Sequence, residues 1–197
     1  VILIASSLRP ARADGSDWLS VTMDGLSSLG VTVVAAVGNE GPGEASVGSP
    51  ADGRDVIAVG AFSQTYKIFP SSSRGPTLDG RVKPDIVAPS GVSTASLDGG
   101  YTVMEGTSAA SAVVAGAMAL LRQVYPGVPS EALRQIILNR AVDLSPSPDN
   151  TYGYGRLDVL YAMDGYEPII IPSIGDEVFG GQQHTVNVMV YNTTGRR

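Results

Sequence analysis

The chain has 197 residues, 43% of them hydrophobic, which is enough to bury the core of one domain or slightly more. Asp and Glu number 19 and Lys and Arg 13, and the resulting formal charge of −6 argues against a nucleic-acid partner or an anionic membrane surface. Cysteine is absent, which excludes disulfides, thiolate metal sites and cysteine nucleophiles.

The first part of the chain alternates predicted strands with a predicted helix. Residues 1–5 are apolar without a basic leader, so we expect a buried strand there rather than a signal peptide. A helix is predicted over 18–29, where apolar residues recur at helical spacing and Gly30 follows. Residues 31–37 and 55–60 are apolar and rich in β-branched side chains, which is typical of parallel strands covered on both faces.

Helices dominate the second part of the chain. Residues 82–88 predict a strand that Pro84 places at a sheet edge or strand start. Helices are predicted over 108–124, then from Ser130 as a cap, and again around 157–163. Because strands alternate with helices, the sequence predicts an α/β fold built on a parallel sheet.

Two stretches bear on membranes and on domain organisation. The apolar stretch 109–121 is shorter than the roughly 20 residues that a membrane span requires, so no span is predicted. From Gly165 onward Pro, Gly and Ile are frequent, and apolar residues then alternate with others. We therefore expect one domain over 1–164, and over 165–197 a linker with the truncated start of an appended immunoglobulin-like β domain. The period-2 residues are Val186, Val188 and Val190.

A serine at a predicted helix start is the first candidate for chemistry. Gly106, Thr107 and Ser108 precede a run of small residues. A helix N-terminus brings backbone N–H groups and a positive dipole end near Ser108, which favours a developing oxyanion. A neutral hydroxyl still needs an adjacent base to act as a nucleophile. The same pattern also fits an ordinary cap, in which Ser108 accepts a bond from an N–H two or three residues further on.

The segment Gly38, Asn39, Glu40 and Gly41 is the second candidate. It follows the predicted strand 31–37, and open α/β sheets bind ligands at the carboxyl ends of their strands. The amide of Asn39 is able to donate a hydrogen bond to an oxyanion. Asn and Gly are also common turn residues, so a plain turn stays open as an alternative.

In their order along the chain, these and further motifs resemble those of the subtilisin-like serine proteases (subtilases). The resemblance covers about residues 1–163 and implies the C-terminal half of the catalytic domain. It implies a partial subtilisin-like fold, three-layered with a mostly parallel sheet. The matching segments are Gly38 to Gly41, Ser49 to Ala51, Val56 to Ala61, Ser72 to Pro76, Lys83 to Pro89, Gly106 to Gly116 and Tyr152 to Asp158.

The resemblance also implies roles for individual residues. Ser108 would be the nucleophile, and Asn39 would donate its side-chain N–H to the tetrahedral oxyanion. The backbone N–H of Ser108 would be a second donor, with Thr107 as a minor helper. Glu40 would rim the pocket for basic substrate side chains, or else be a solvated loop residue. The implied substrate-binding residues are Thr107 and the strand-end segment of Ala35, Ala36, Val37 and Gly38.

Expectations for cofactors, partners and location follow from the same resemblance. No cofactor is required. Asp85 aligns with a weak cation site of some subtilases, in which backbone oxygens near Ala51 contribute, and such oxygen ligands suit Ca²⁺; a capping or surface Asp is the alternative. A protein or peptide substrate, a monomeric state and a secreted location are expected.

Two departures from the family pattern stand out. The family's catalytic Asp and His precede the nucleophile, yet no His precedes Ser108, and the one histidine, His184, lies in the tail. We therefore expect both partners outside this sequence and no activity from the chain by itself. In addition Leu3, Ala5 and Ser7 occupy the positions of an Asn-x-Ser-x-Gly strand that pairs with substrate in the family.

Two other functions are compatible with parts of the sequence. The altered first strand fits a degenerate subtilase that serves as a peptide-binding or structural module. An α/β-hydrolase esterase would need Ser, Asp and His in that order, which Ser108, Asp143 or Asp158, and His184 satisfy. However, the residues around Ser108 lack the final Gly of the G-x-S-x-G motif.

Overall fold

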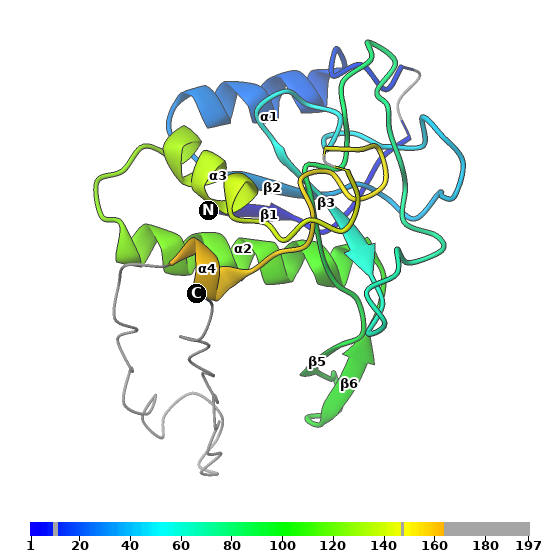
Figure 1. The fold of residues 1–197 in the computed structure, drawn as a ribbon, viewed down its shortest axis with the longest axis vertical. Coiled ribbons are helices and arrows are strands. Elements are labelled where there is room, and N and C mark those ends of the chain that lie inside the picture. The colour runs from blue at the N-terminus through cyan, green and yellow to red at the C-terminus, as the bar shows by residue number, and fades with distance from the viewer. Residues whose placement is uncertain (10–11, 147, 164–197) are drawn as a thin grey trace. The chain divides into compact units, whose positions relative to one another are not determined.

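The computed structural model describes residues 1–9, 12–146 and 148–163 (Figure 1). In this part of the chain four strands form a parallel sheet in the order β1-β2-β3-β4, and two more form an antiparallel hairpin. The strands are β1 (Ile2–Ile4), β2 (Val33–Ala36), β3 (Ile57–Phe62), β4 (Ile86–Pro89), β5 (Val92–Ala95) and β6 (Tyr101–Met104). The helices are α1 (Trp18–Ser28), α2 (Thr107–Val124), α3 (Ser130–Asn139) and α4 (Val159–Ala162).

The sheet separates two hydrophobic cores, so the fold has three layers. On one face, apolar side chains of β2 and of the segment entering β3 pack against Met23 and Leu26 of α1. On the other face, β2, β3 and β4 pack against α2 and α3, and α2 contacts all four strands. Figure 1 shows α1 and α2 on opposite sides of the sheet. The predicted α/β fold with a mostly parallel sheet is confirmed.

The helix starts show which capping predictions are correct. Asp17 caps α1, because its side chain accepts from the backbone N–H groups of Leu19 and Ser20. The N-cap of α2 is Gly106, so Ser108 lies inside the first turn and its interpretation as a cap is wrong. Ser130 is also no cap: it is the first residue of α3, and its hydroxyl donates to a backbone carbonyl outside the helix.

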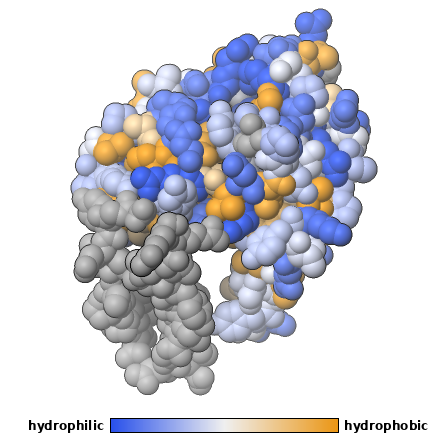
Figure 2. All heavy atoms as spheres, in the orientation of Figure 1, coloured by the Kyte–Doolittle hydropathy of each residue, from blue (hydrophilic) through white to orange (hydrophobic). Residues whose placement is uncertain are grey.

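The hairpin of β5 and β6 was not predicted from the sequence. Its register pairs Val92 with Met104 and Ala95 with Tyr101. Figure 1 shows the hairpin projecting from the body of the molecule, and Figure 2 shows apolar and polar side chains mixed over this face. Tyr101 and Met104 are exposed, as are most hairpin side chains. Without a buried face, these strands lack the hydrophobic alternation that identifies a strand.

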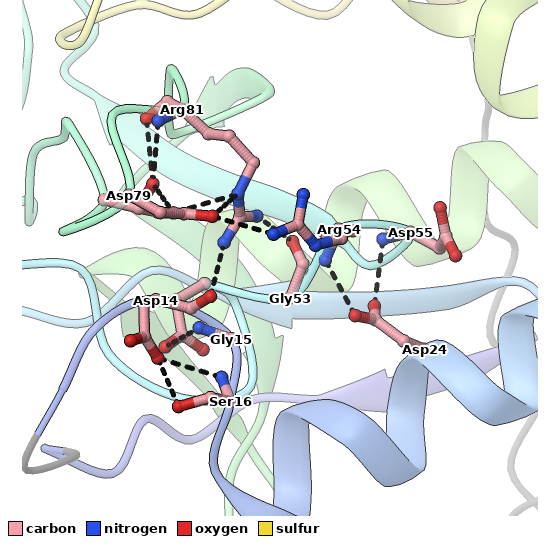
Figure 3. A network of polar contacts seen from close by, with 11 residues as sticks. Asp14, Gly15, Ser16, Asp24, Gly53, Arg54, Asp55, Asp79 and Arg81 are labelled. Carbon is pink, nitrogen blue, oxygen red and sulfur yellow. Dashed lines mark hydrogen bonds and ion pairs between the residues drawn. The ribbon is translucent and has the colours of Figure 1, made fainter.

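Arg81 joins three loops next to the start of α1 (Figure 3). Its Nε donates to the carboxylate of Asp79 at 2.9 Å, its Nη1 to the carbonyl of Gly53 at 3.1 Å, and its Nη2 to the carbonyl of Asp14 at 2.9 Å. The hydrogen bond from Arg81 lowers the pKa of Asp79 to about 2. These contacts fix the loops that lead into α1.

Two predictions remain, one on the end of the chain and one on a membrane span. The predicted linker and β segment over 165–197, with His184, lie outside the described residues. Among the residues that are described, α2 alone has the length and composition to cross a membrane. Its buried residues, including Met118 and Leu121, pack into the core beside the sheet.

Candidate active site

A cleft of about 350 Å³ lies where β1 and β2 end, next to the start of α2. The two strands are parallel, with Ile4 opposite Ala35, so the segments that follow them leave the same edge of the sheet. Polar loop residues gather there because backbone at a strand end is no longer covered by the two helix layers. The cleft is lined by Ala5, Ser6, Ser7, Leu8, Arg9, Ala36, Gly38, Asn39, Glu40, Ser46, Gly48, Thr107 and Ser108.

The side chain of Asn39 is held in one orientation by the start of α2. Its Oδ1 accepts from the backbone N–H of Thr107 at 3.1 Å and from the Thr107 hydroxyl at 3.2 Å. A backbone N–H can only donate, so the atom facing it is the amide oxygen. The amide is planar, and its NH₂ group is therefore turned away from Thr107 as a donor.

Gly106 lets the amide of Asn39 come this close to the helix. Gly106 has φ +88°, and a Cβ there would lie 3.1 Å from Oδ1 and 3.3 Å from Nδ2 of Asn39. The backbone N–H of Gly106 donates to the hydroxyl of Ser90 at 2.8 Å, and this bond holds the turn to the segment that follows β4. The glycine of the motif thus supplies both a left-handed turn and the space that Asn39 occupies.

Ser108 lines the same cleft and contacts the segment that follows β1. Its hydroxyl is half-buried and donates to the carbonyl oxygen of Ala5 at 2.7 Å, across 103 residues of sequence. Its backbone N–H belongs to the first turn of α2, where N–H groups have no carbonyl partner within the helix. Ser108 therefore offers a hydroxyl and a backbone donor close together.

Asn39 and Ser108 meet at one place although they are far apart in sequence. Asn39 contacts Thr107, the residue directly before Ser108, and both line the cleft. The start of α2 thus brings the Asn39 side chain, N–H groups of the first helical turn and the positive helix end to the cleft that Ser108 lines. This arrangement suits a carbonyl whose carbon is attacked by the hydroxyl and whose oxygen becomes negative.

The predicted substrate segment is only partly exposed to the cleft. Ala36, Gly38 and Thr107 line it. Ala35 and Val37 are buried in the hydrophobic core on the α1 side of the sheet, so their side chains have no place in the cleft. The reason is the alternation of a strand, which turns successive side chains to opposite faces.

The predicted calcium ligand Asp85 has other partners, and its surroundings do not fit a cation. The ammonium of Lys83 lies 2.7 Å from one carboxylate oxygen, and Nη2 of Arg134 lies 3.0 Å from the other. The backbone N–H of Ala58 also donates to Asp85 at 2.7 Å. Two positive groups at a nearly buried carboxylate repel a further cation. The predicted partner Ala51 is buried in the hydrophobic core on the α1 side of the sheet.

Several cleft residues escaped the sequence analysis. Ser46 and Gly48 come from the loop after β2, and Leu8 and Arg9 from the segment after β1. Leu8 and Ser49 exchange two backbone hydrogen bonds of 2.8 Å, which brings the two segments together. The Ser49 to Ala51 motif lay next to this contact, but pairing between distant segments has no local signal. Glu40 is exposed at the cleft rim.

Comparisons with known proteins identify the family of the chain. The model of the subtilase family, Peptidase_S8, matches residues 6–155. Membrane-bound transcription factor site-1 protease of Homo sapiens is 34% identical over 86% of this chain, which spans 19% of that protein. Serine protease AprX of Bacillus subtilis is 32% identical, in an alignment that covers 70% of this chain and 36% of AprX. Subtilisin DY of Bacillus licheniformis is 36% identical over 74% of the chain and 51% of its own length.

Solved protease structures share the fold. The prenylagaramide maturation protease PagA superposes with a TM-score of 0.69 at 26% identity, covering 81% of this chain and 59% of that one. Sphericase superposes with a TM-score of 0.69 at 25% identity, covering 79% and 55%. The family match rules out the α/β-hydrolase alternative, and Asp158 caps α4 rather than facing the cleft. By its motifs, its fold and these matches, the chain belongs to the subtilase family of serine proteases.

Proposed function

We propose that the protein is a serine endopeptidase in which Ser108 forms the acyl-enzyme and Asn39 stabilises the oxyanion. The observation that carries the proposal is the pair of hydrogen bonds from Thr107 to Asn39, which fix the orientation of the Asn39 amide in the cleft that Ser108 lines. The family match supports a peptidase, and proteins or peptides are its substrates. Secretion and a monomeric state stay predictions.

The chemistry begins with the Ser108 hydroxyl. Its oxygen attacks the peptide carbonyl carbon while its proton passes to a base, and the carbonyl oxygen becomes an oxyanion that accepts from Asn39 Nδ2 and the Ser108 backbone N–H. Collapse of the tetrahedral intermediate breaks the peptide bond, and the leaving amine takes the proton from the base. Water then hydrolyses the acyl-enzyme by the same steps in reverse.

The base comes from outside the sequence described here. No histidine precedes Ser108, and its hydroxyl donates to the carbonyl of Ala5, which is far too weak a base to remove a proton. We therefore propose that an Asp and a His from another part of the protein complete the triad. The 197-residue chain expressed alone is accordingly expected to be inactive.

A fluorophosphonate probe tests the proposal on the full-length protein. We expect one adduct per molecule on Ser108, located by peptide mass mapping, and loss of labelling and of peptide hydrolysis in Ser108→Ala. Ser28→Ala, at an exposed serine on α1, serves as the matched control and keeps both. A protein that folds and binds peptides but takes no label and cleaves nothing is the degenerate binding module instead. Stoichiometric labelling of Ser108 in the isolated chain would contradict the assignment of the base.

A further inference from the structure

One serine of the cleft occupies space that would otherwise be open to a substrate side chain. Ser7 is half-buried, lines the cleft and directs its hydroxyl toward the carbonyl of Val37 at 3.4 Å. A Cβ on Gly48 would overlap with Ser7 Oγ, and a Cβ on Gly38 would lie 3.0 Å from it. Ser7 Oγ thus fills the gap between two glycines.

The backbone around Ser7 leaves the side chain little freedom to withdraw. Two residues before it, the carbonyl of Ala5 accepts from Ser108 at 2.7 Å. One residue after it, Leu8 exchanges two backbone hydrogen bonds with Ser49, each of 2.8 Å. A segment fixed on both sides cannot move aside without breaking these bonds, so Ser7 stays against the two glycines.

The position of the reacting carbonyl shows which substrate residue meets Ser7. Its carbon must come within about 3–3.5 Å of Ser108 Oγ, with its oxygen toward Asn39. The side chain of the same substrate residue must then fit in the cleft, whose lining includes Ala36, Gly38 and Gly48 next to Ser7. Ser7 Oγ takes up part of that space.

On this basis we infer that Ser7 is a specificity-determining residue, which restricts the substrate residue whose carbonyl is attacked to small side chains such as Gly, Ala or Ser. The inference rests on the proposed peptidase function and adds its substrate class. An aromatic side chain there would require Ser7 to move or the acyl carbon to retreat from Ser108. Glu40 and Arg9 lie on the same cleft but outside the space between the two glycines.

The test compares full-length wild type with Ser7→Gly on two peptides that differ only in Ala or Phe at the attacked position. We expect the wild type to have a higher kcat/KM for the Ala peptide than for the Phe peptide. Ser7→Gly should raise the ratio of kcat/KM for Phe to kcat/KM for Ala by about 10- to 200-fold, the discrimination that one methylene group produces in a hydrophobic pocket. Ser7→Ala, which keeps Cβ and removes Oγ, should lie between them. Ser28→Gly removes an exposed serine side chain on α1, outside the cleft, so its ratio should equal that of the wild type.

Binding gives a second measurement that needs no turnover. In a Ser108→Ala background, product peptides ending in Ala should bind more tightly than those ending in Phe, and Ser7→Gly should remove this difference. Cleavage that depends on Ser108 but has an unchanged Phe-to-Ala ratio in Ser7→Gly would overturn the inference and leave the proposed function intact. Absence of any cleavage that depends on Ser108 would overturn the proposed function and this inference with it.

Discussion

The side-chain oxygen of Asn39 accepts a hydrogen bond of 3.1 Å from the backbone N–H of Thr107, although the two residues lie 68 positions apart. The bond consumes one of the N–H groups that a helix start leaves without a partner. It also fixes the orientation of the Asn39 amide in the cleft that Ser108 lines. One contact therefore stabilises the start of α2 and positions the proposed oxyanion donor.

Removal of the amide should slow catalysis much more than it changes stability. We expect Asn39→Ala in the full-length protein to lower kcat by about 100- to 1,000-fold with little change in KM, because the donor acts on charge that develops in the transition state. Thr107→Val removes only the hydroxyl contact of 3.2 Å and keeps the backbone N–H, so its effect should be smaller. Steady-state kinetics on a peptide substrate measure both, and an equal loss in the two variants would contradict the assigned role.

Gly106 should tolerate no side chain. Its φ of +88° and ψ of −176° belong to a region that is essentially restricted to glycine, and a Cβ would press on the Asn39 amide. We expect Gly106→Ala to lower the free energy of unfolding by about 1–3 kcal/mol and to reduce activity as well. Gly116→Ala is the matched control: this exposed glycine inside α2 has nothing near its Cβ position, and alanine should stabilise by about 0.5–1 kcal/mol. Chemical denaturation measures both, and equal effects would refute the argument.

The stability of the protein should depend strongly on the buried carboxylate of Asp85 and weakly on the exposed carboxylate of Glu131. Asp85→Ala would leave the ammonium of Lys83, which is almost fully buried, without its partner, and should cost about 3–5 kcal/mol of unfolding free energy. Burial lowers the pKa of Lys83, and Asp85 opposes that shift, so the variant should also favour a neutral lysine. Glu131→Gln, which removes the more exposed carboxylate paired with Arg134, should cost about 0–1 kcal/mol. A similar small loss for Asp85→Ala would contradict this ranking.

A buried carboxyl near the start of α1, that of Asp52, should make stability depend on pH. Asp52 is buried, and the hydroxyl of Ser20 lies 2.6 Å from its carboxylate. The same hydroxyl lies 2.7 Å from the carboxylate of Asp17 and 2.9 Å from the hydroxyl of Ser49. The Ser49 hydroxyl in turn lies 2.7 Å from the carboxylate of Asp17. Two hydroxyl protons cannot satisfy four such oxygen pairs, so a further proton on Asp52 improves the network. Burial, reinforced by the charge of Asp17, raises the pKa of Asp52 above 3.8.

The sign of the effect follows from that direction. A raised pKa means that the folded state binds the proton more tightly, so this contribution is complete below 3.8 and is lost as pH rises through the folded pKa of Asp52. Asp52→Asn is isosteric and always neutral, and it should raise the unfolding free energy at neutral pH and flatten its pH dependence above 3.8. Thermal unfolding measured across pH checks this, and an unchanged slope in Asp52→Asn would show that Asp52 does not titrate in this range.

The central strands and most helices could be predicted because their signals are local. Residues 32–37 and 56–60 are buried, and the apolar runs that contain them predicted β2 and β3 to within a few residues. The small-residue run after Ser108 likewise predicted α2. The β5–β6 hairpin was missed because its side chains are exposed and no burial pattern marks it.

The candidate site was predictable in its residues and only partly in its geometry. The motifs around Asn39 and Ser108 pointed to one cleft, and the structure brings both to it. The interpretation of Asp85 failed because its partner Arg134 lies 49 residues further along the chain. The role of Ser7 could not be predicted, because it depends on how closely the segment after β1 approaches Gly48.

A crystal structure of the full-length protein phosphonylated by the fluorophosphonate probe tests the account most directly, since the adduct mimics the tetrahedral intermediate. We predict that the phosphorus is bonded to Ser108 Oγ and that the phosphoryl oxygen lies about 3 Å from both Asn39 Nδ2 and the Ser108 backbone nitrogen. A phosphoryl oxygen that faces away from Asn39, or an adduct on a different serine, would contradict it.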